Sequence, residues 1–210
     1  MTTAPRWRRR KDARPSEIVD AALAAFAERG YAATRLDDVA ERAGIGKGTL
    51  YLYFPSKEEL FKAVVRQHLL PNLAAAERRL EAADGPTAPL LAEIVAGLVA
   101  AAAGPMGAIP KLIIGEAANF PDLARFYADE VVARGFGVFQ RLIARGVASG
   151  EFRPVDPATA APLLAAPILL TALWKNALEP HAAARMDEAA LAQGAVDLLL
   201  HGLRRTEDAP

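Results

Sequence analysis

The fold of this 210-residue chain is decided by residues 34–64, TRLDDVAERAGIGKGTLYLYFPSKEELFKAV. Apolar positions in this stretch recur at helical spacing, and it carries its own start and stop signals. Thr34 is predicted to cap a short helix that ends at Gly44, and Pro55 closes the next one, over 47–54. Only Ile45 and Gly46 separate the two helices. So tight a glycine-containing turn predicts a helix-turn-helix.

A further helix is predicted on each side of this pair. The first begins at the N-cap Ser16 and ends at Gly30, with apolar residues such as Phe26 along one face. The last opens with a capping box made by Ser56 and Glu59. We therefore expect a helix-turn-helix DNA-binding domain over residues 15–62.

The predicted helix at 47–54 carries outward residues that suit the major groove of DNA. They supply a positive charge, close backbone approach, a hydroxyl, a methyl group and aromatic faces with polar tips. These residues are Lys47, Gly48, Thr49, Tyr51 and Tyr53. Leu50 and Phe54, four residues apart, are the expected inward anchors. The alternatives are that the tyrosines pack the core and that Lys47, like Lys57 at the start of the next helix, is an ordinary solvated lysine.

An AG turn followed by KGTLYxYF and PSKEEL at fixed spacing resembles the DNA-binding signature of the tetracycline-repressor-type (TetR) family of bacterial transcriptional regulators. The resemblance covers roughly residues 16–65. It implies phosphate contacts at Thr34 and Lys57 and a base or backbone contact at Arg35. It further implies a recognition helix that starts with Lys47, Gly48 and Thr49 and contacts bases and phosphates through Tyr51 and Tyr53. Two positions depart from the pattern: Gly46, where the family often has Ser, and Leu52, where many relatives carry a polar or aromatic residue.

Charge is distributed unevenly along the chain. The 25 basic and 25 acidic residues cancel overall, but residues 1–66 hold 13 basic and 9 acidic residues, against 12 and 16 in residues 67–210. Much of the positive excess lies in residues 1–14, which we expect to form a basic, disordered arm. This arm is either a solvated tail or a segment that follows the phosphate backbone or enters the minor groove.

The remainder of the chain, residues 63–205, is expected to be a second all-α domain, with a frayed tail over 206–210. Long helices are predicted at 122–148, 157–178 and 187–204, and Pro162 and Pro167 should kink the second of them. The resemblance implies that this part binds a small effector and dimerises through the last two helices.

The composition of these two helices independently favours a dimer, because it supplies more apolar surface than one layer of helices hides. The alternative is that this surface is all intramolecular core. The residues concerned are Leu163, Leu164, Leu170, Leu173, Trp174, Leu191, Val196, Leu198, Leu199 and Leu200.

An effector pocket is predicted within this second domain. Such a pocket is mostly apolar, with a few polar groups that orient the ligand. The candidate polar residues are Glu116, Asn119, Tyr127 and Trp174, with Arg125 and Asn176 as further possibilities. The Ala-rich surroundings favour a hydrophobic effector, whose identity the sequence does not reveal.

Composition argues against other classes of protein. The chain has no cysteine, 52% hydrophobic residues and no uninterrupted run of about 18 apolar residues, so we expect a cytoplasmic protein without a membrane partner. The three histidines lie far apart, and no nucleophile motif or phosphate loop is present. We therefore predict no enzyme activity, no metal and no cofactor.

The preferred function is a homodimeric repressor that a small hydrophobic effector releases from a palindromic operator in double-stranded DNA. The alternative is a helical small-molecule-binding or scaffold protein whose DNA-binding domain is non-functional. Retention of Lys47, Tyr51, Tyr53 and Lys57 together speaks against that alternative.

Overall fold

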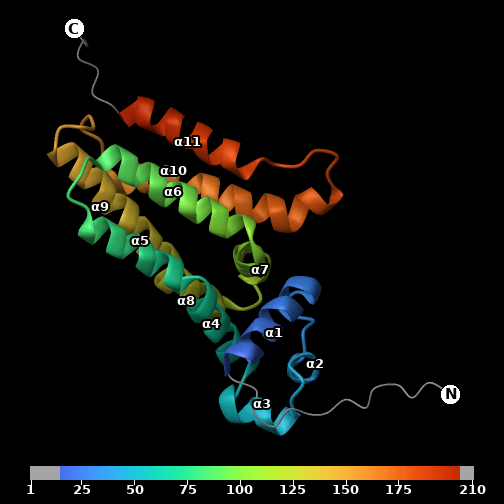
Figure 1. Cartoon of the computed structure of the whole chain (residues 1–210). Helices are drawn as coiled ribbons and strands as arrows, with labels where there is room; N and C mark the ends of the chain where they lie inside the picture. The colour runs from blue at the N-terminus through green and yellow to red at the C-terminus, as the bar shows by residue number, and fades with distance from the viewer. Residues whose placement is uncertain (1–14, 204–210) are drawn as a thin grey trace. The chain divides into compact units, whose positions relative to one another are not determined.

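The computed structural model describes residues 15–203 as helices joined by short turns (Figure 1). No β-strand occurs within that range, so the all-α prediction is confirmed. The chain divides into two compact units between Gln67 and His68. The predicted domain boundary at residue 62 falls inside a helix that continues to His68. The predicted basic arm, residues 1–14, and the predicted frayed tail, residues 206–210, lie outside the described residues.

The first unit consists of four helices. They are α1 (Pro15–Arg29), α2 (Leu36–Arg42), α3 (Lys47–Tyr53) and α4 (Lys57–His68). Gly30 and Gly44 follow α1 and the end of α2 with φ values of 83° and 72°, a left-handed conformation that glycine adopts at little cost. The predicted helix-turn-helix is therefore present as α2 and α3.

Three aromatic rings hold the first unit together. Phe26 of α1, Tyr31 of the following turn and Phe61 of α4 are buried. Their ring centroids lie 5.4–5.6 Å apart in tilted and edge-on arrangements, which are favourable for aromatic pairs. The predicted anchors Leu50 and Phe54 are also buried, so one face of α3 is fixed to this core.

Two predicted helix caps have different outcomes. The N–H group of Glu59 donates to Ser56 Oγ at 3.1 Å, as expected at the start of α4. The cap predicted at Thr34 is wrong, because α2 begins one residue later and Arg35 is its N-cap. There the Arg35 N–H donates to Asp38 Oδ2 at 3.4 Å. The Thr34 hydroxyl instead points into the unit.

The second unit is built mainly from longer helices. They are α5 (Leu70–Ala82), α6 (Thr87–Ala103), α7 (Ala108–Glu116), α8 (Pro121–Tyr127), α9 (Arg134–Ala148), α10 (Pro157–Leu173) and α11 (Glu188–Leu203). A short 3₁₀ turn, Pro105–Gly107, joins α6 to α7. In Figure 1, α6, α10 and α11 run side by side, and α10 also packs against α9. The core of this unit lies between these helices, around Leu91, Phe139 and Phe152.

Two of the predicted long helices contain π-helical turns. The helix predicted at 122–148 consists of α8, a π-helical segment Ala128–Ala133 and α9. The helix predicted at 157–178 consists of α10, which continues past both internal prolines, and a π-helical segment Trp174–Leu178. Segments of this kind are rare and are frequent at functional sites.

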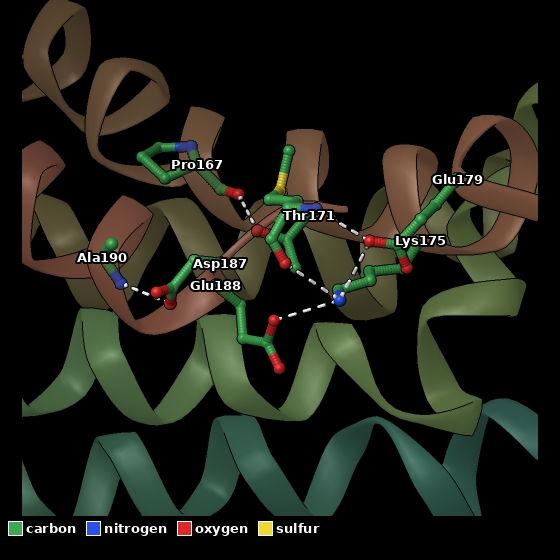
Figure 2. Close-up of polar contacts among 8 residues, drawn as sticks. Pro167, Thr171, Lys175, Glu179, Asp187, Glu188 and Ala190 are labelled. Carbon is green, nitrogen blue, oxygen red and sulfur yellow. Dashed lines mark hydrogen bonds and ion pairs between the residues drawn. The ribbon is translucent and has the colours of Figure 1, made fainter. Parts of the chain in front are cut away.

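A polar cluster closes the connection between α10 and α11 (Figure 2). The Lys175 ammonium pairs with Glu179 at 3.2 Å and Glu188 at 3.0 Å, and it donates to the Met186 carbonyl at 3.1 Å. The Met186 N–H donates to Glu179 Oε1 at 2.8 Å. A short 3₁₀ turn, Glu179–His181, lies within this connection. The cluster fixes how the last helix returns along the unit.

The Pro157–His181 helix is long and apolar enough to cross a membrane, and 22% of its most apolar 18-residue stretch is buried. The bent pair Thr87–Ala103 and Pro105–Glu116 meets the same criterion only when counted as one span. A core helix of a soluble protein also has this length and composition, but such a helix is mostly buried. The low burial of the Pro157–His181 helix shows that residues 15–203 leave much of its apolar surface uncovered.

Candidate functional site

The outward face of α3 carries the residues predicted to contact DNA. Lys47 and Gly48 are exposed, and Tyr51 and Tyr53 are 42% and 47% exposed. The alternative in which both tyrosines pack the core is therefore wrong. The intervening Leu52 is 85% exposed. Together these residues form the solvent-facing surface of α3, with Gly48 and Leu52 roughly opposite the buried anchors and the two tyrosines on either flank.

A hollow of about 310 Å³ lies beside this face, within the first unit. Its lining brings together residues from the turn before α2, from α2, from α3 and from the start of α4. The lining residues are Ala32, Thr34, Arg35, Leu36, Asp37, Lys47, Tyr51 and Lys57. Five of the eight predicted DNA contacts thus line a single concave surface.

Lys47 is held by Asp37 across the helix-turn-helix. Its Nζ lies 2.9 Å from one carboxylate oxygen and 3.0 Å from the other. The hydrogen bond to Asp37 and its charge raise the pKa of Lys47 above its usual value. The ammonium also lies 5.8 Å from the centre of the Tyr51 ring. The sequence predicted Lys47 but not its carboxylate partner, which orients the cation beside the recognition face.

Lys57 and Thr34 are engaged with the turn between α1 and α2. The Lys57 ammonium donates to the carbonyl oxygens of Tyr31, Ala32 and Thr34 at 2.8, 3.0 and 3.1 Å, and it lies 4.6 Å from the centre of the Tyr31 ring. Thr34 is 1% exposed, and its hydroxyl bonds to the carbonyls of Gly30 and Ala25 at 2.6 and 3.2 Å. Both side chains thus brace this turn, a role that the sequence pattern did not indicate.

Ion pairs join α1 to α2 next to the site. Arg29 lies 2.8 Å from Asp38, and Arg42 is bonded to Glu28. The hydrogen bond from Arg42 lowers the pKa of Glu28, and the same bond raises the pKa of Arg42. Exposed pairs of this kind contribute little stability singly, but both connect α1 to α2.

The predicted effector residues lie in the second unit, at the ends of helices. Glu116 ends α7, and its carboxylate accepts a hydrogen bond from Asn119 Nδ2 at 3.3 Å. Tyr127 ends α8, directly before one π-helical segment, and its burial raises the pKa of the phenol. Trp174 begins the other segment, and its Nε1 is buried without a hydrogen-bond acceptor among the described residues.

Of the two further possibilities, Arg125 is exposed and pairs with Asp122, and the Asn176 carbonyl accepts from Lys111 Nζ at 2.8 Å. A separate cavity of about 60 Å³ opens between α5 and α6, near Asn72 and Ile94. None of the predicted effector residues lines it. That volume has room for a few water molecules, not for an effector.

Comparison with known proteins places both units in one family. Residues 18–64 match the family model described as bacterial regulatory proteins, tetR family, and residues 84–192 match the tetracyclin repressor-like C-terminal domain.

Two curated relatives align over most of the chain. The transcriptional regulator RutR of Escherichia coli K12 is 32% identical over 171 residues, 75% of this chain and 73% of its own. The transcriptional repressor KstR2 of Mycolicibacterium smegmatis is 31% identical over 144 residues, 67% and 68% of the two chains.

A solved structure shows the same fold. The regulator FadR of Bacillus subtilis, in complex with stearoyl-CoA, superposes with a TM-score of 0.73 at 20% identity, covering 90% of this chain and 99% of that one. With the exposed α3 face, the family matches favour a DNA-binding regulator over the scaffold alternative. The chain belongs to the TetR family of bacterial DNA-binding transcriptional regulators.

Proposed function

We propose that the protein is a homodimeric repressor that binds a palindromic operator through α3 and leaves it when a small hydrophobic effector binds the second unit. The observation that carries the proposal is the exposed surface of α3, with Lys47, Tyr51 and Tyr53 open to solvent while Leu50 and Phe54 are buried and anchor the helix. A helix fixed in this way can enter a major groove without unfolding the unit.

The expected DNA contacts are of two kinds: contacts to phosphates, which position the protein, and contacts to base edges, which recognise the sequence. Lys47 and Tyr53 would bind phosphates, which hold the protein in register, and Tyr51, Thr49 and Arg35 would reach base edges. Gly48 keeps the backbone open for close approach to the duplex. Lys57 and Thr34 would act by fixing the turn that presents Arg35, since their polar groups bond to carbonyls of that turn.

The dimer would form through the exposed faces of α10 and α11. On α10, the exposed residues from position 162 onward recur at helical spacing and are all apolar: Pro162, Leu163, Ala166, Leu169 and Leu170. On α11, Leu198 is 78% exposed. A second copy covering these stripes would remove their apolar surface from water and would present two recognition helices to successive turns of the DNA. Leu164 and Val196, by contrast, belong to the core of the unit.

The effector would bind near Tyr127 and Trp174. Both are partly buried side chains that carry a polar group, and both border π-helical segments. The Trp174 donor has no acceptor among residues 15–203. An effector with an apolar body and an acceptor oxygen would satisfy the indole N–H. It would release DNA by binding more tightly to a dimer whose recognition helices do not match the operator spacing.

Selection of duplexes from a random pool with the full-length protein tests the DNA function. We expect a palindrome with half-site centres about one helical turn, roughly 10 base pairs, apart. The variant Tyr51→Ala should lose preference for that palindrome while retaining weak binding to unrelated DNA. Failure to enrich any palindrome, or equal binding by Tyr51→Ala, would contradict the proposal.

Tryptophan fluorescence tests the effector site. The chain has two tryptophans, Trp7 and Trp174, so the variant Trp7→Phe leaves Trp174 as the single reporter. Titration with a series of acyl-CoA compounds, chosen because FadR is solved with stearoyl-CoA, should include a member that shifts the emission and releases the operator. A compound that releases the operator without any change at Trp174 would contradict this placement.

A further inference from the structure

Leu52 projects directly away from the core of the first unit. At about 100° per residue, its side chain lies roughly 160° around the helix axis from both Leu50 and Phe54, the two buried anchors of α3. Its exposed fraction, 85%, is the highest among the large hydrophobic residues of the described range. Whatever molecule faces α3 therefore meets Leu52 near the centre of the helix surface.

The neighbouring turn of α3 leaves room around this leucine. Gly48, four residues earlier, has no side chain, and a Cβ placed there would meet no atom within 4 Å. Helical side chains lean toward the N-terminus, so the Leu52 isobutyl group covers the turn that carries Gly48. An apolar group thus stands on the same face of α3 as the bare backbone of Gly48.

The chemistry of the major groove narrows what this apolar group can contact. Base edges there present hydrogen-bond donors and acceptors, which a leucine cannot satisfy, and one apolar group, the C5-methyl of thymine. Packing against that methyl removes apolar surface of both partners from water. Packing against a donor or acceptor would instead leave the polar group of the base unpaired.

We propose that Leu52 is a specificity-determining residue that packs on the C5-methyl group of one thymine in each operator half-site. The assignment rests on the proposed function, because it requires α3 to enter the major groove. Leu52 would thus recognise an apolar group of the operator, in addition to the polar base edges assigned to Tyr51, Thr49 and Arg35. Each half-site then contains one thymine at which a base without the C5-methyl group lowers the affinity of the protein for the operator.

The test is a thymine-to-uracil scan of the selected operator, because uracil removes the methyl group and keeps every hydrogen-bonding group. In the wild-type protein, uracil at the responsive position of one half-site should weaken binding about fourfold. Uracil at that position in both half-sites should weaken it about fifteenfold. In Leu52→Ala, the same substitutions should change the affinity less than about twofold, because the partner of the methyl is already absent. Leu52→Met, which keeps an apolar side chain, should retain the thymine preference.

The controls separate this assignment from folding and from the operator itself. Leu52→Ala should unfold at the wild-type temperature, since the side chain is exposed. The salt dependence of its DNA binding should equal that of the wild-type protein. The assignment is overturned if uracil weakens wild type and Leu52→Ala equally, or if no thymine in the half-site responds in wild type. If the Leu52 assignment fails in this way while wild type still binds the palindrome and Tyr51→Ala does not recognise it, the proposed DNA function still stands. If the selection enriches no palindrome, both the Leu52 assignment and the proposed DNA function are contradicted.

Discussion

The two units of the molecule carry function in different ways. In the first unit, the functional residues are exposed side chains on a seven-residue helix whose orientation is fixed by two buried anchors and a tight turn. In the second unit, the candidate effector residues are partly buried at helix ends and beside π-helical segments. A surface site needs only a rigid support, whereas an interior site depends on the packing of every helix around it.

The largest expected effect comes from removing the support of the surface site. Phe61→Ala deletes one member of the aromatic group formed with Phe26 and Tyr31 and should cost about 3–5 kcal/mol. A unit of this size has only a few kcal/mol of stability, so residues 15–67 should unfold. Calorimetry and circular dichroism should show loss of one transition and retention of helix in the second unit. Simultaneous unfolding of both units would contradict the division at Gln67.

The next effect concerns the uncovered apolar stripe of α10. The double variant Leu163→Glu and Leu170→Glu should be monomeric by light scattering, because it places charge where a second copy would pack. Loss of the paired half-site contacts should weaken operator binding about 100-fold or more. A control with glutamate at the exposed residues Ala118 and Ala128 should remain dimeric. A double variant that still dimerises would refute the proposed interface.

Two glycines of α9 offer a matched test of how tightly the second unit is packed. A Cβ at Gly146 would lie 2.1 Å from the ring of Phe152, which is 2% exposed, whereas a Cβ at Gly137 would meet nothing within 4 Å. Gly146→Ala should therefore destabilise the unit by about 1–3 kcal/mol. Gly137→Ala should stabilise it by about 0.5–1 kcal/mol, because alanine favours the helix. Urea unfolding of both variants measures the contrast, and similar values would show a loosely packed unit.

A smaller effect, confined to acidic solution, should come from Glu151. Its carboxylate accepts hydrogen bonds from the N–H groups of Thr87 and Ala88 at 2.8 and 3.1 Å, at the start of α6. Burial acts to raise its pKa, but these donors and the Ser149 hydroxyl outweigh burial, so the pKa lies below its usual value. The stabilisation is thus present above the unfolded pKa, about 4.3, and is lost as pH falls through the folded pKa.

The variant Glu151→Gln isolates this contribution. It should be less stable than wild type near neutral pH, and the difference should shrink in acid, as thermal unfolding at a series of pH values would show. A difference that persists unchanged below the folded pKa would mean that the carboxylate charge is not responsible.

The sequence predicted the first unit closely because its boundaries are local. Gly30 and Gly44 end helices through their own backbone conformation, and Ser56 caps α4 with its own hydroxyl. The same pattern could not show that Thr34 is buried or that Lys57 bonds to three carbonyls more than 20 residues away. Those roles depend on how the turn before α2 folds against the start of α4, which no local signal encodes.

The second unit was predicted only in outline. Apolar periodicity located its long helices, but the π-helical segments at Ala128–Ala133 and Trp174–Leu178 carry no pattern that distinguishes them from α-helix. Sequence composition also could not separate Leu164, which is buried, from Leu163, which is 60% exposed. Which leucine faces outward is decided by the helices that pack against α10, and so is the location of an effector pocket.

The measurement that tests the central claim most directly is the salt dependence of operator binding by the full-length protein. We predict a steep linear fall of log K with log salt, with a slope of about −0.9 for each phosphate neutralised. Lys47→Met should reduce the slope by about 1.8 for a dimer, one contact in each half-site. Lys57→Met should leave the slope nearly unchanged, because its ammonium bonds to carbonyls of its own unit. A wild-type slope near zero would contradict DNA recognition through the exposed face of α3.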